Sequence, residues 1–391
     1  MALNTVSSDR LATNVKNTNF TSAEKQDLTN DILPLAGQLG NRNLIINGAM
    51  QVAQRGTSSV NQGYSTVDRF KTINSGLDEA PTREQADVAS GATPYTLGFR
   101  KSFKTTNGNN TGGAGAADYY IIRTILEAQD IANSGWNYTS SSSFITLSFW
   151  VKSSVAQNFY GSVHTKDGTE YAYPFETGSL TADTWTKITK TIPGNSNLTF
   201  NNDSGEGLRI NIFPFFGTDY TASSVNLNQW AAYSISTQTP DSTSTWYTTN
   251  DATFEITGVQ LEVGSVATEF EHRSFSDELL KCQRYCQKLG ASNGTYDCMA
   301  VGNAIYNTFG FVPHRLVVTM RSTPSFTLLG SASDFNYTRD GGDYAPTAIV
   351  LDQAGRNMVA VKVTGSNLSN DEAIRLFNMN TTGGYLFTAE L

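Results

Sequence analysis

The chain has 391 residues, with 27 Lys and Arg against 35 Asp and Glu, a formal net charge of −8. Charged residues make up only 16% of it, and Gly, Ser, Thr and Asn take their place, as is typical of strands joined by polar turns. The acidic charge and the lack of Lys/Arg clusters exclude a basic nucleic-acid-binding protein. We also expect no membrane insertion, because no apolar run approaches ~18 residues.

Residues 1–43 differ from the rest of the chain, because their sequence pattern predicts a short helix. The segment TSAE at residues 21–24 has the pattern of a capping box, and Leu28, Ile32 and Leu35 follow at helical spacing. This apolar stripe has no partner element beside it, so we expect it to pack on another chain or on the following domain. The segment is interpreted as an assembly arm, and the alternative is a frayed leader.

Residues 44–272 have the pattern of many short strands without helical crossovers. Continuous or alternating apolar residues predict strands at residues 144–151, 185–192, 208–213 and 254–263. Polar, turn-rich stretches separate them. This pattern predicts an antiparallel jelly-roll β-sandwich, so the fold class is mainly β.

Residues 273–290 predict one linking helix. Ser274 and Ser276 are candidate N-caps and Gly290 is a candidate helix end. Four apolar residues follow one another at 3-4-3 spacing, which is typical of helices that pack together; they are Leu279, Cys282, Cys286 and Leu289. This seam predicts self-association, although it is too short to establish a coiled coil and could equally pack on the sandwich.

Residues 291–391 return to strand-like patterns, with glycine pairs that mark turns. They predict a smaller C-terminal β domain. We find no internal repeat, which disfavours propellers, solenoids and parallel β-helices.

Several segments, taken in order, resemble a family of bacteriophage tail-fibre and virion structural proteins. They are NLIINGAMQVAQRG at 43–56, YSTVDRF at 64–70, LSFWVK at 147–152, GVQLEVG at 258–264, ATEFE at 267–271, CQRY at 282–285, FVP at 311–313 and MRSTP at 320–324. The resemblance spans residues 43–325, most of the chain. It implies a jelly roll similar to carbohydrate-binding modules and assembly as a homotrimer.

The resemblance therefore implies a phage virion structural protein, made in the host cytoplasm. We expect a short tail fibre or appendage, which docks on another virion protein through residues 1–43 and presents its β domains for attachment to a host-surface glycan. The distal domain would be residues 291–391. One alternative is a capsid vertex or decoration fibre, and a weaker one is a glycan-cleaving spike enzyme.

Catalytic and metal-binding patterns find little support in the sequence. None of the three histidines lies in a known catalytic motif, and no pattern selects a pair of carboxylates. Cys282 and Cys286 would need Cys298 and His272 to complete a zinc site, and a buried free cysteine is the simpler interpretation. Residues 201–206 are rich in oxygen ligands for Ca²⁺, with a polar turn as the alternative. We therefore predict no enzyme, cofactor or metal.

Carbohydrate binding is better supported, because sugars commonly bind exposed aromatic rings beside amide and carboxylate groups. Five aromatic residues lie in or beside polar loops and are the candidate platforms; they are Trp230, Trp246, Tyr247, Tyr337 and Tyr344. For each of them the alternative is a structural role.

Overall fold

A computed structural model describes residues 41–291 and 296–391. The predicted N-terminal arm, with Leu28, Ile32 and Leu35, lies outside the described residues. The described chain is mainly β, and every pair of neighbouring strands within it is antiparallel. The predicted fold class is therefore confirmed.

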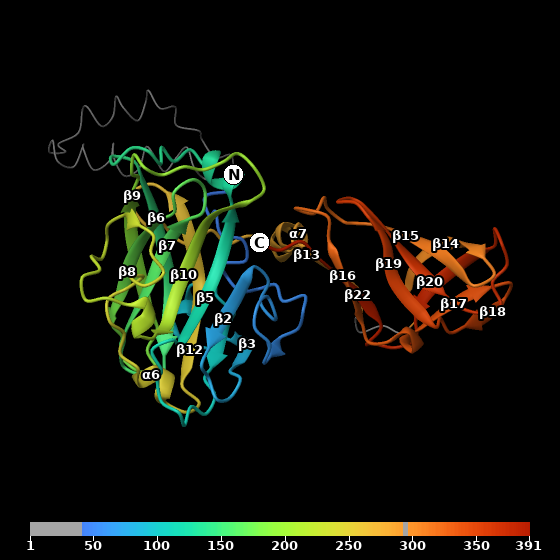
Figure 1. Ribbon diagram of the computed structural model, residues 1–391, viewed down its shortest axis with the longest axis horizontal. Helices are drawn as coiled ribbons and strands as arrows, with labels where there is room; N and C mark the ends of the chain where they lie inside the picture. The colour runs from blue at the N-terminus through green and yellow to red at the C-terminus, as the bar shows by residue number, and fades with distance from the viewer. Residues whose placement is uncertain (1–40, 292–295) are drawn as a thin grey trace, which may run out of the picture. The chain divides into compact units, whose positions relative to one another are not determined.

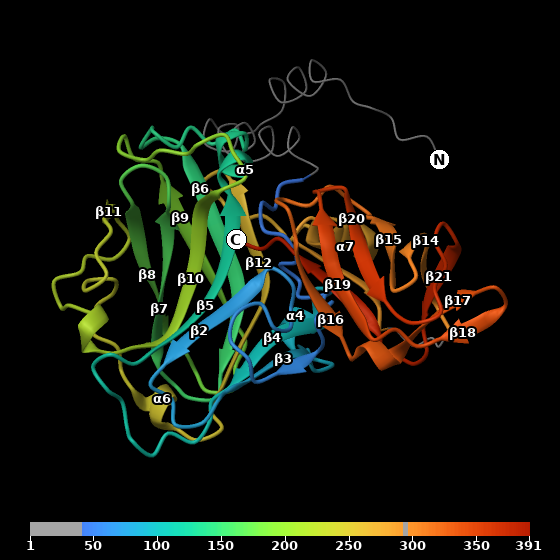
Figure 2. The ribbon, with the colours of Figure 1, turned by 45° about the vertical axis from the view of Figure 1, so that its right-hand side comes forward.

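The strands between residues 58 and 263 form two facing six-stranded sheets, which make a jelly-roll sandwich (Figure 1). The first sheet contains, in spatial order, β11 (Ala231–Ala232), β8 (Tyr171–Ser179), β7 (Asn158–Thr165), β10 (Glu206–Phe216), β5 (Tyr119–Glu127) and β2 (Phe70–Ser75). The second contains β1 (Ser58–Ser59), β3 (Thr82–Asp87), β4 (Lys101–Thr106), β12 (Thr253–Val263), β6 (Phe144–Ser153) and β9 (Thr186–Pro193). We call them sheet I and sheet II; Figure 2 shows β11 at the edge of sheet I, beside β8.

Strand alternation decides which side chains of sheet I enter the core. Along β10, Leu208, Ile210 and Ile212 are buried in the core between the two sheets, so Arg209 and Asn211 lie on the opposite, outer face. The same alternation places Tyr120 and Ile122 of β5 in the core and Arg123 outside. The outer face of sheet I therefore collects every second residue of its strands.

The strands after residue 285 form two further antiparallel sheets with a core of their own. The smaller contains β13 (Cys286–Gly290), β22 (Gly384–Thr388) and β16 (Ser325–Leu329). The larger contains β18 (Gly342–Tyr344), β17 (Phe335–Arg339), β21 (Ala373–Asn378), β14 (Cys298–Tyr306), β15 (Phe309–Arg315), β20 (Met358–Thr364) and β19 (Ala348–Ala354). Residues 43–391 belong to one unit, so the domain boundaries at 272 and 290 stay predictions.

The helices of the described residues are few and short. They are α4 (Thr93–Thr96), α5 (Ala128–Ala132), η2 (Thr218–Tyr220), α6 (Thr245–Thr248), α7 (Phe275–Gln283) and η3 (Ala332–Asp334). No helix in this part of the chain has the length and apolar character needed to cross a membrane.

The linking helix is shorter than the sequence predicts. It begins as expected, since Ser274 is the N-cap and its hydroxyl accepts a hydrogen bond from the Asp277 amide. However, α7 ends at Gln283, and Cys286 begins strand β13, which pairs with β22 near the end of the chain. The backbone N–H and C=O groups of residues 286–290 thus hydrogen-bond to a strand that is distant in sequence. The spacing of apolar residues along a helix cannot reveal such a partner.

The predicted helical seam is therefore wrong as a continuous stripe. Leu279 and Cys282 lie on α7, whereas Cys286 and Leu289 lie on β13. Both cysteines are fully buried within this chain, and Leu279 and Leu289 are half-buried. The two thiols are thus small apolar groups of the chain's own interior.

Candidate functional site

One row of side chains crosses the outer face of sheet I. The register of the strands places Pro174, Ser162, Asn211, Arg123 and Lys71 side by side, one each from β8, β7, β10, β5 and β2. We call these five residues the polar row. Four strand spacings of ~4.8 Å give it a length of ~19 Å.

Hydrogen bonds hold the middle of the polar row in a defined arrangement. The Arg123 Nε donates to the Asn211 Oδ1 at 2.6 Å, and the Asn211 Nδ2 donates to the Ser162 Oγ at 3.1 Å. Asn211 and Ser162 are nearly fully buried, with 2% and 4% of their surface exposed. Arg123 is half-buried. Its guanidinium is thus anchored through Nε.

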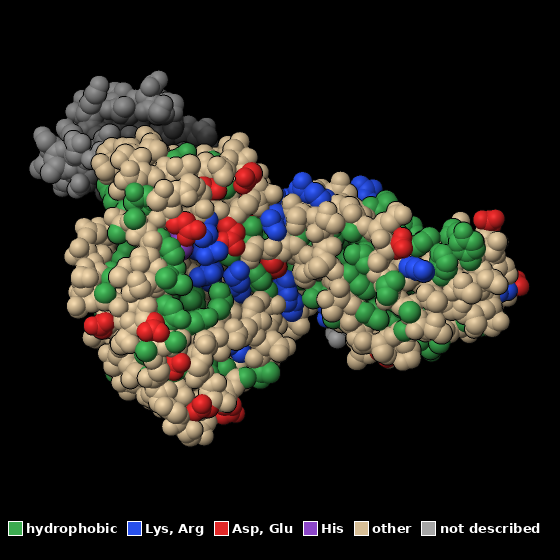
Figure 3. Space-filling view, in the orientation of Figure 1, with side chains coloured by type: hydrophobic (Ala, Val, Ile, Leu, Met, Phe, Trp, Pro, Cys, Tyr) green, Lys and Arg blue, Asp and Glu red, His purple; other side chains and the backbone are tan. Residues whose placement is uncertain are grey.

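Charged side chains surround the polar row, and most of them are paired. Arg209 forms an ion pair with Glu206 through Nε at 2.9 Å and through Nη2. Glu170 accepts from Lys166 and from the His164 ring, the latter at 2.8 Å. Figure 3 shows lysine and arginine side chains gathered over the middle of this face, with acidic side chains beside them.

Lys71 and Arg123 differ from these pairs, because neither forms an ion pair with an Asp or Glu side chain among the described residues. Lys71 instead donates its Nζ to the main-chain oxygen of Leu391, the last residue, at 2.8 Å. Burial lowers the pKa of Lys71 to about 8; Glu206 opposes this shift, whereas Arg123 and Arg209 add to it. Burial and the charge of Arg209 also lower the pKa of Arg123 to about 10. The face therefore carries a local excess of positive charge.

An apolar band lies beside the polar row on the same face. Ile121, Phe213 and Phe216 are buried and form one cluster. The partly buried residues that pack on it are Ile73, Tyr119, Tyr160 and Tyr220. Apolar and aromatic surface next to fixed polar groups is typical of ligand-binding surfaces.

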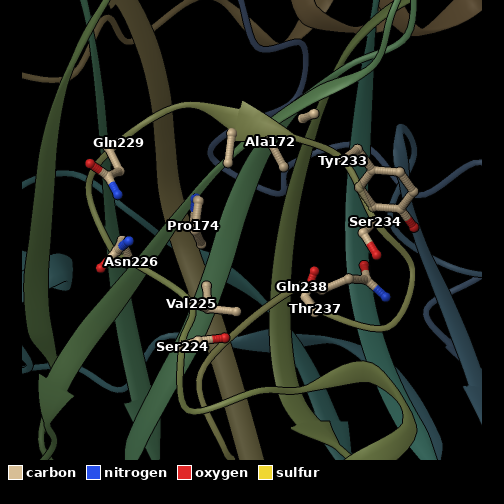
Figure 4. A pocket seen from close by; sticks show the side chains of 12 residues that line it. Ala172, Pro174, Ser224, Val225, Asn226, Gln229, Tyr233, Ser234, Thr237 and Gln238 are labelled. Carbon is tan, nitrogen blue, oxygen red and sulfur yellow. The ribbon is translucent and has the colours of Figure 1, made fainter.

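A pocket of about 200 Å³ lies where the segment after η2 passes over β8, at the Pro174 end of the polar row. Figure 4 shows Asn226 and Gln229 on one side of it and Tyr233, Ser234 and Gln238 on the other, with Ala172 and Pro174 between them. Its lining thus combines amide, hydroxyl and aromatic side chains.

Tyr233 is the aromatic ring of this pocket. It is half-buried and stacks on the His164 ring with 4.1 Å between ring centroids and 20° between ring planes. Burial lowers the pKa of His164, so its ring is neutral at pH 7. The stack fixes the orientation of the Tyr233 ring, which lines the pocket.

Two of the predicted aromatic platforms are buried on one helix, and the expectation that they are exposed was wrong. Trp246 and Tyr247 lie on α6 and are fully buried. Trp246 packs edge-on against Tyr120 and donates its Nε1 to the Thr253 carbonyl at 3.1 Å. Tyr247 stacks on Phe215 with 4.3 Å between ring centroids. The helix turns both rings into the sandwich, where their apolar surface leaves water.

The other three predicted platforms do not line the pocket. Tyr337 is fully buried, against expectation, because β17 faces the core of the larger C-terminal sheet and its hydroxyl donates to the Ser366 carbonyl. Tyr344 is half-buried and stacks on Tyr337. Trp230 is half-buried and donates its Nε1 to the Pro193 carbonyl at 2.6 Å.

The sequence held a partial signal for the residues that the prediction missed. The alternating pattern at residues 208–213 already places Arg209 and Asn211 on the face opposite the apolar residues. What it lacks is the strand order, which alone brings Asn211 beside Arg123 and Lys71. Tyr233 carried no signal, because it lies in a polar segment without periodicity.

The oxygen-rich segment at residues 201–206 uses its carboxylates locally. Asp203 accepts from the Gly205 amide at 2.8 Å, and Glu206 is paired with Arg209. Within residues 41–291 and 296–391, no three His, Cys, Asp or Glu side chains lie together in a way that could hold a metal ion.

Comparisons with known proteins give distant structural likenesses. No protein-family model and no curated protein matches the sequence. A tailspike protein 4 enzymatically active domain of bacteriophage CBA120 is similar at 11% identity and a TM-score of 0.30, over 57% of this chain and 21% of that one. A CBM22-1 xylan-binding domain from Paenibacillus barcinonensis is similar at 11% identity and a TM-score of 0.27, over 57% of this chain and 96% of that one. A CBM4 structure is similar at 13% identity and a TM-score of 0.27, over 56% and 98%.

These scores are low, so the likenesses carry no argument about function. This chain spans about a fifth of the tailspike structure (21%). The functional argument therefore rests on the described side chains.

Proposed function

We propose that this protein is a phage virion fibre that attaches to a host-surface glycan through the outer face of sheet I. The observation that carries the proposal is the polar row leading into a pocket lined by amide side chains and the Tyr233 ring. The virion role is supported by the resemblance of residues 43–325 to phage fibre proteins.

The chemistry of this face suits neutral sugar hydroxyls. A hydroxyl both donates and accepts hydrogen bonds, and the side-chain amides of Asn226, Gln229 and Gln238 offer both functions at the pocket. The Tyr233 ring and the apolar band offer surface for the apolar face of a sugar. Individually weak contacts suffice where several copies of a fibre bind together, because linked sites gain avidity.

We propose binding and not hydrolysis, because the carboxylates beside the polar row are held by cations. A glycosidase acid needs a raised pKa. Burial opposes the shift, but hydrogen bonds from Lys166 and His164 lower the pKa of Glu170. Glu206 is engaged by Arg209. Incubation with bound polysaccharide should therefore release no reducing ends; their appearance, and their loss in Glu170→Gln, would favour the glycan-cleaving alternative.

Glycan binding is tested on an array of bacterial surface polysaccharides. We expect Tyr233→Ala and Gln238→Ala to weaken binding to the glycans that the wild type retains. Tyr306→Ala is the matched control, because Tyr306 is 55% exposed on β14, in another sheet. Equal binding by all four proteins, or no glycan retained by the wild type, would contradict the proposed site.

The virion role is tested by immunogold labelling of intact particles with antibodies against residues 291–391. Label on the tail supports a tail fibre, whereas label on the capsid supports the vertex or decoration fibre. Particles that carry no label, with an antibody that recognises the free protein, would contradict exposure of this domain on the virion.

We also propose a homotrimer, as the resemblance to phage fibres implies. Light scattering on the full chain should give three times the mass of one chain. A monomer would overturn this part of the proposal.

A further inference from the structure

Two like charges stand opposite each other in the polar row. Lys71 on β2 and Arg123 on β5 are directly paired in the antiparallel register. Like charges at directly opposed positions destabilise a sheet. Because the chain as a whole carries a net charge of −8, a general excess of cations does not explain this pair.

The charges near this pair do not neutralise it. Arg209 engages Glu206, and Lys166 engages Glu170. Glu390 precedes Leu391, which accepts the hydrogen bond from Lys71, but the Glu390 carboxylate forms ion pairs with Arg55 and Arg69. Arg123 thus has no Asp or Glu partner in the described part of the chain, whereas Lys71 is hydrogen-bonded to the main-chain oxygen of Leu391, the last residue.

The guanidinium of Arg123 is arranged for a planar anion. Its Nε is occupied by Asn211, and Asn211 is held in turn by Ser162. A guanidinium held in place in this way presents two parallel N–H groups, which match the two oxygens of a carboxylate. Lys71, from the neighbouring strand, adds a point charge on the same side.

We propose that Lys71 and Arg123 bind the carboxylate of an acidic sugar residue in the glycan. This inference rests on the proposed function and specifies its substrate class. The neutral part of the glycan extends across the same face of sheet I, and its other end enters the pocket at Tyr233. This face would thus bind the charged sugar at one end and the hydroxyl groups of neutral sugars at the other.

The experiment measures the binding of two forms of one oligosaccharide by calorimetry. Oligogalacturonate carries a carboxylate on each sugar, and its methyl ester keeps the same backbone without charge. We expect the wild type to bind the acid form and Arg123→Gln to bind it ~10- to 100-fold more weakly. Arg123→Lys keeps the positive charge but loses the two parallel N–H groups of the guanidinium, so its loss of affinity should be smaller. Binding of the methyl ester should not respond to Arg123→Gln.

Lys187→Gln is the matched control, because Lys187 is an exposed cation on β9 of sheet II. Circular dichroism and thermal midpoints of all variants check that they fold. A dextran sulfate oligosaccharide forms a third arm; binding of the sulfate but not of the carboxylate would overturn the assignment to acidic sugars bearing carboxylates.

The outcomes separate this inference from the proposed function. If acid and ester bind equally and Arg123→Gln changes neither, the carboxylate site is overturned while glycan binding on this face stands. If neither form binds, the carboxylate site is again overturned, and the polysaccharide array with Tyr233→Ala then decides the proposed function on its own.

Discussion

Lys71 and Arg123 occupy directly opposed positions on β2 and β5, so two cations face each other across an antiparallel pair. Such a pair costs stability, and each member could be replaced by a neutral residue without disturbing the core, because both lie on the outer face. The main-chain oxygen of Leu391 accepts from Lys71 at 2.8 Å, and an anion bound between the two cations would offset the remaining repulsion. Its energetic cost and its affinity for anions are therefore linked.

The first prediction concerns that cost. Lys71→Gln removes one of the two opposed charges and should raise the free energy of unfolding by ~0.2–1 kcal/mol. Urea unfolding measures it, with Lys187→Gln as the control that should leave stability unchanged. A loss of stability in Lys71→Gln would mean that its hydrogen bond to the Leu391 carbonyl oxygen outweighs the repulsion.

The second prediction concerns pH. The pKa of Lys71 is lowered by burial to about 8, with Glu206 opposing the shift and Arg123 and Arg209 adding to it. Deprotonation of Lys71 removes charge from the carboxylate site, so affinity for oligogalacturonate should fall as the pH rises from 7 to 9. Calorimetry across this range should show the fall in the wild type and a flatter profile in Lys71→Gln.

The lowered pKa of Lys71 also makes stability depend on pH, in the direction opposite to that of the affinity. The folded pKa of Lys71 lies below its ordinary value of 10.5, so between about 8 and 10.5 the unfolded chain binds more protons than the folded one. The contribution of Lys71 to stability therefore rises over that window, where affinity falls. Parallel slopes of affinity and stability would contradict this account.

The third prediction concerns the junction between the sandwich and α7. Glu127 is fully buried and accepts hydrogen bonds from the Arg284 Nε and Nη2, both at 2.7 Å, and from the Tyr285 hydroxyl at 2.5 Å. Arg284→Met leaves a buried carboxylate without its cation, and loss of one partner of a buried pair costs ~3–5 kcal/mol. Because Arg284 is itself 27% exposed, we expect the lower end of that range in urea unfolding.

A double variant isolates the unpaired charge as the cause. Arg284→Met with Glu127→Leu removes both charges and should recover much of the stability lost in the single variant. If the double variant is no more stable than Arg284→Met, packing and not charge explains the loss.

Acid should weaken the same junction. Burial opposes the shift, but hydrogen bonds from Arg284 and Tyr285 lower the pKa of Glu127 below its ordinary value. Its contribution is present above the unfolded pKa and is lost as the pH falls through the folded one.

The fourth prediction concerns Gly258, where the pairing of β12 with β6 shifts register. Its φ is +62°, and a Cβ there would lie 2.7 Å from the Phe99 Cζ. Gly258→Ala should cost more than the ~1–2 kcal/mol of the left-handed backbone alone. Gly178→Ala is the control, because its φ is +72° and no atom lies within 4 Å of the added Cβ. Equal losses in thermal unfolding would show that the contact with Phe99 adds nothing.

The sequence by itself determined the β character and the inward and outward faces of the strands. The alternation at residues 208–213 is local, since successive side chains of a strand point to opposite sides, so the pattern alone separates Arg209 and Asn211 from Leu208 and Ile210 of the core. The N-cap at Ser274 was readable for the same reason, because a cap depends on three neighbouring residues.

Tertiary structure alone decided the rest. Strand order brings Lys71, Arg123 and Asn211 into one row from three separate segments, and no local pattern encodes which strand pairs with which. The end of α7 depends on β22, near the end of the chain. Trp246 lies in a polar segment but is buried, because burying an aromatic ring against Tyr120 and Phe254 outweighs the polarity of its neighbours in sequence.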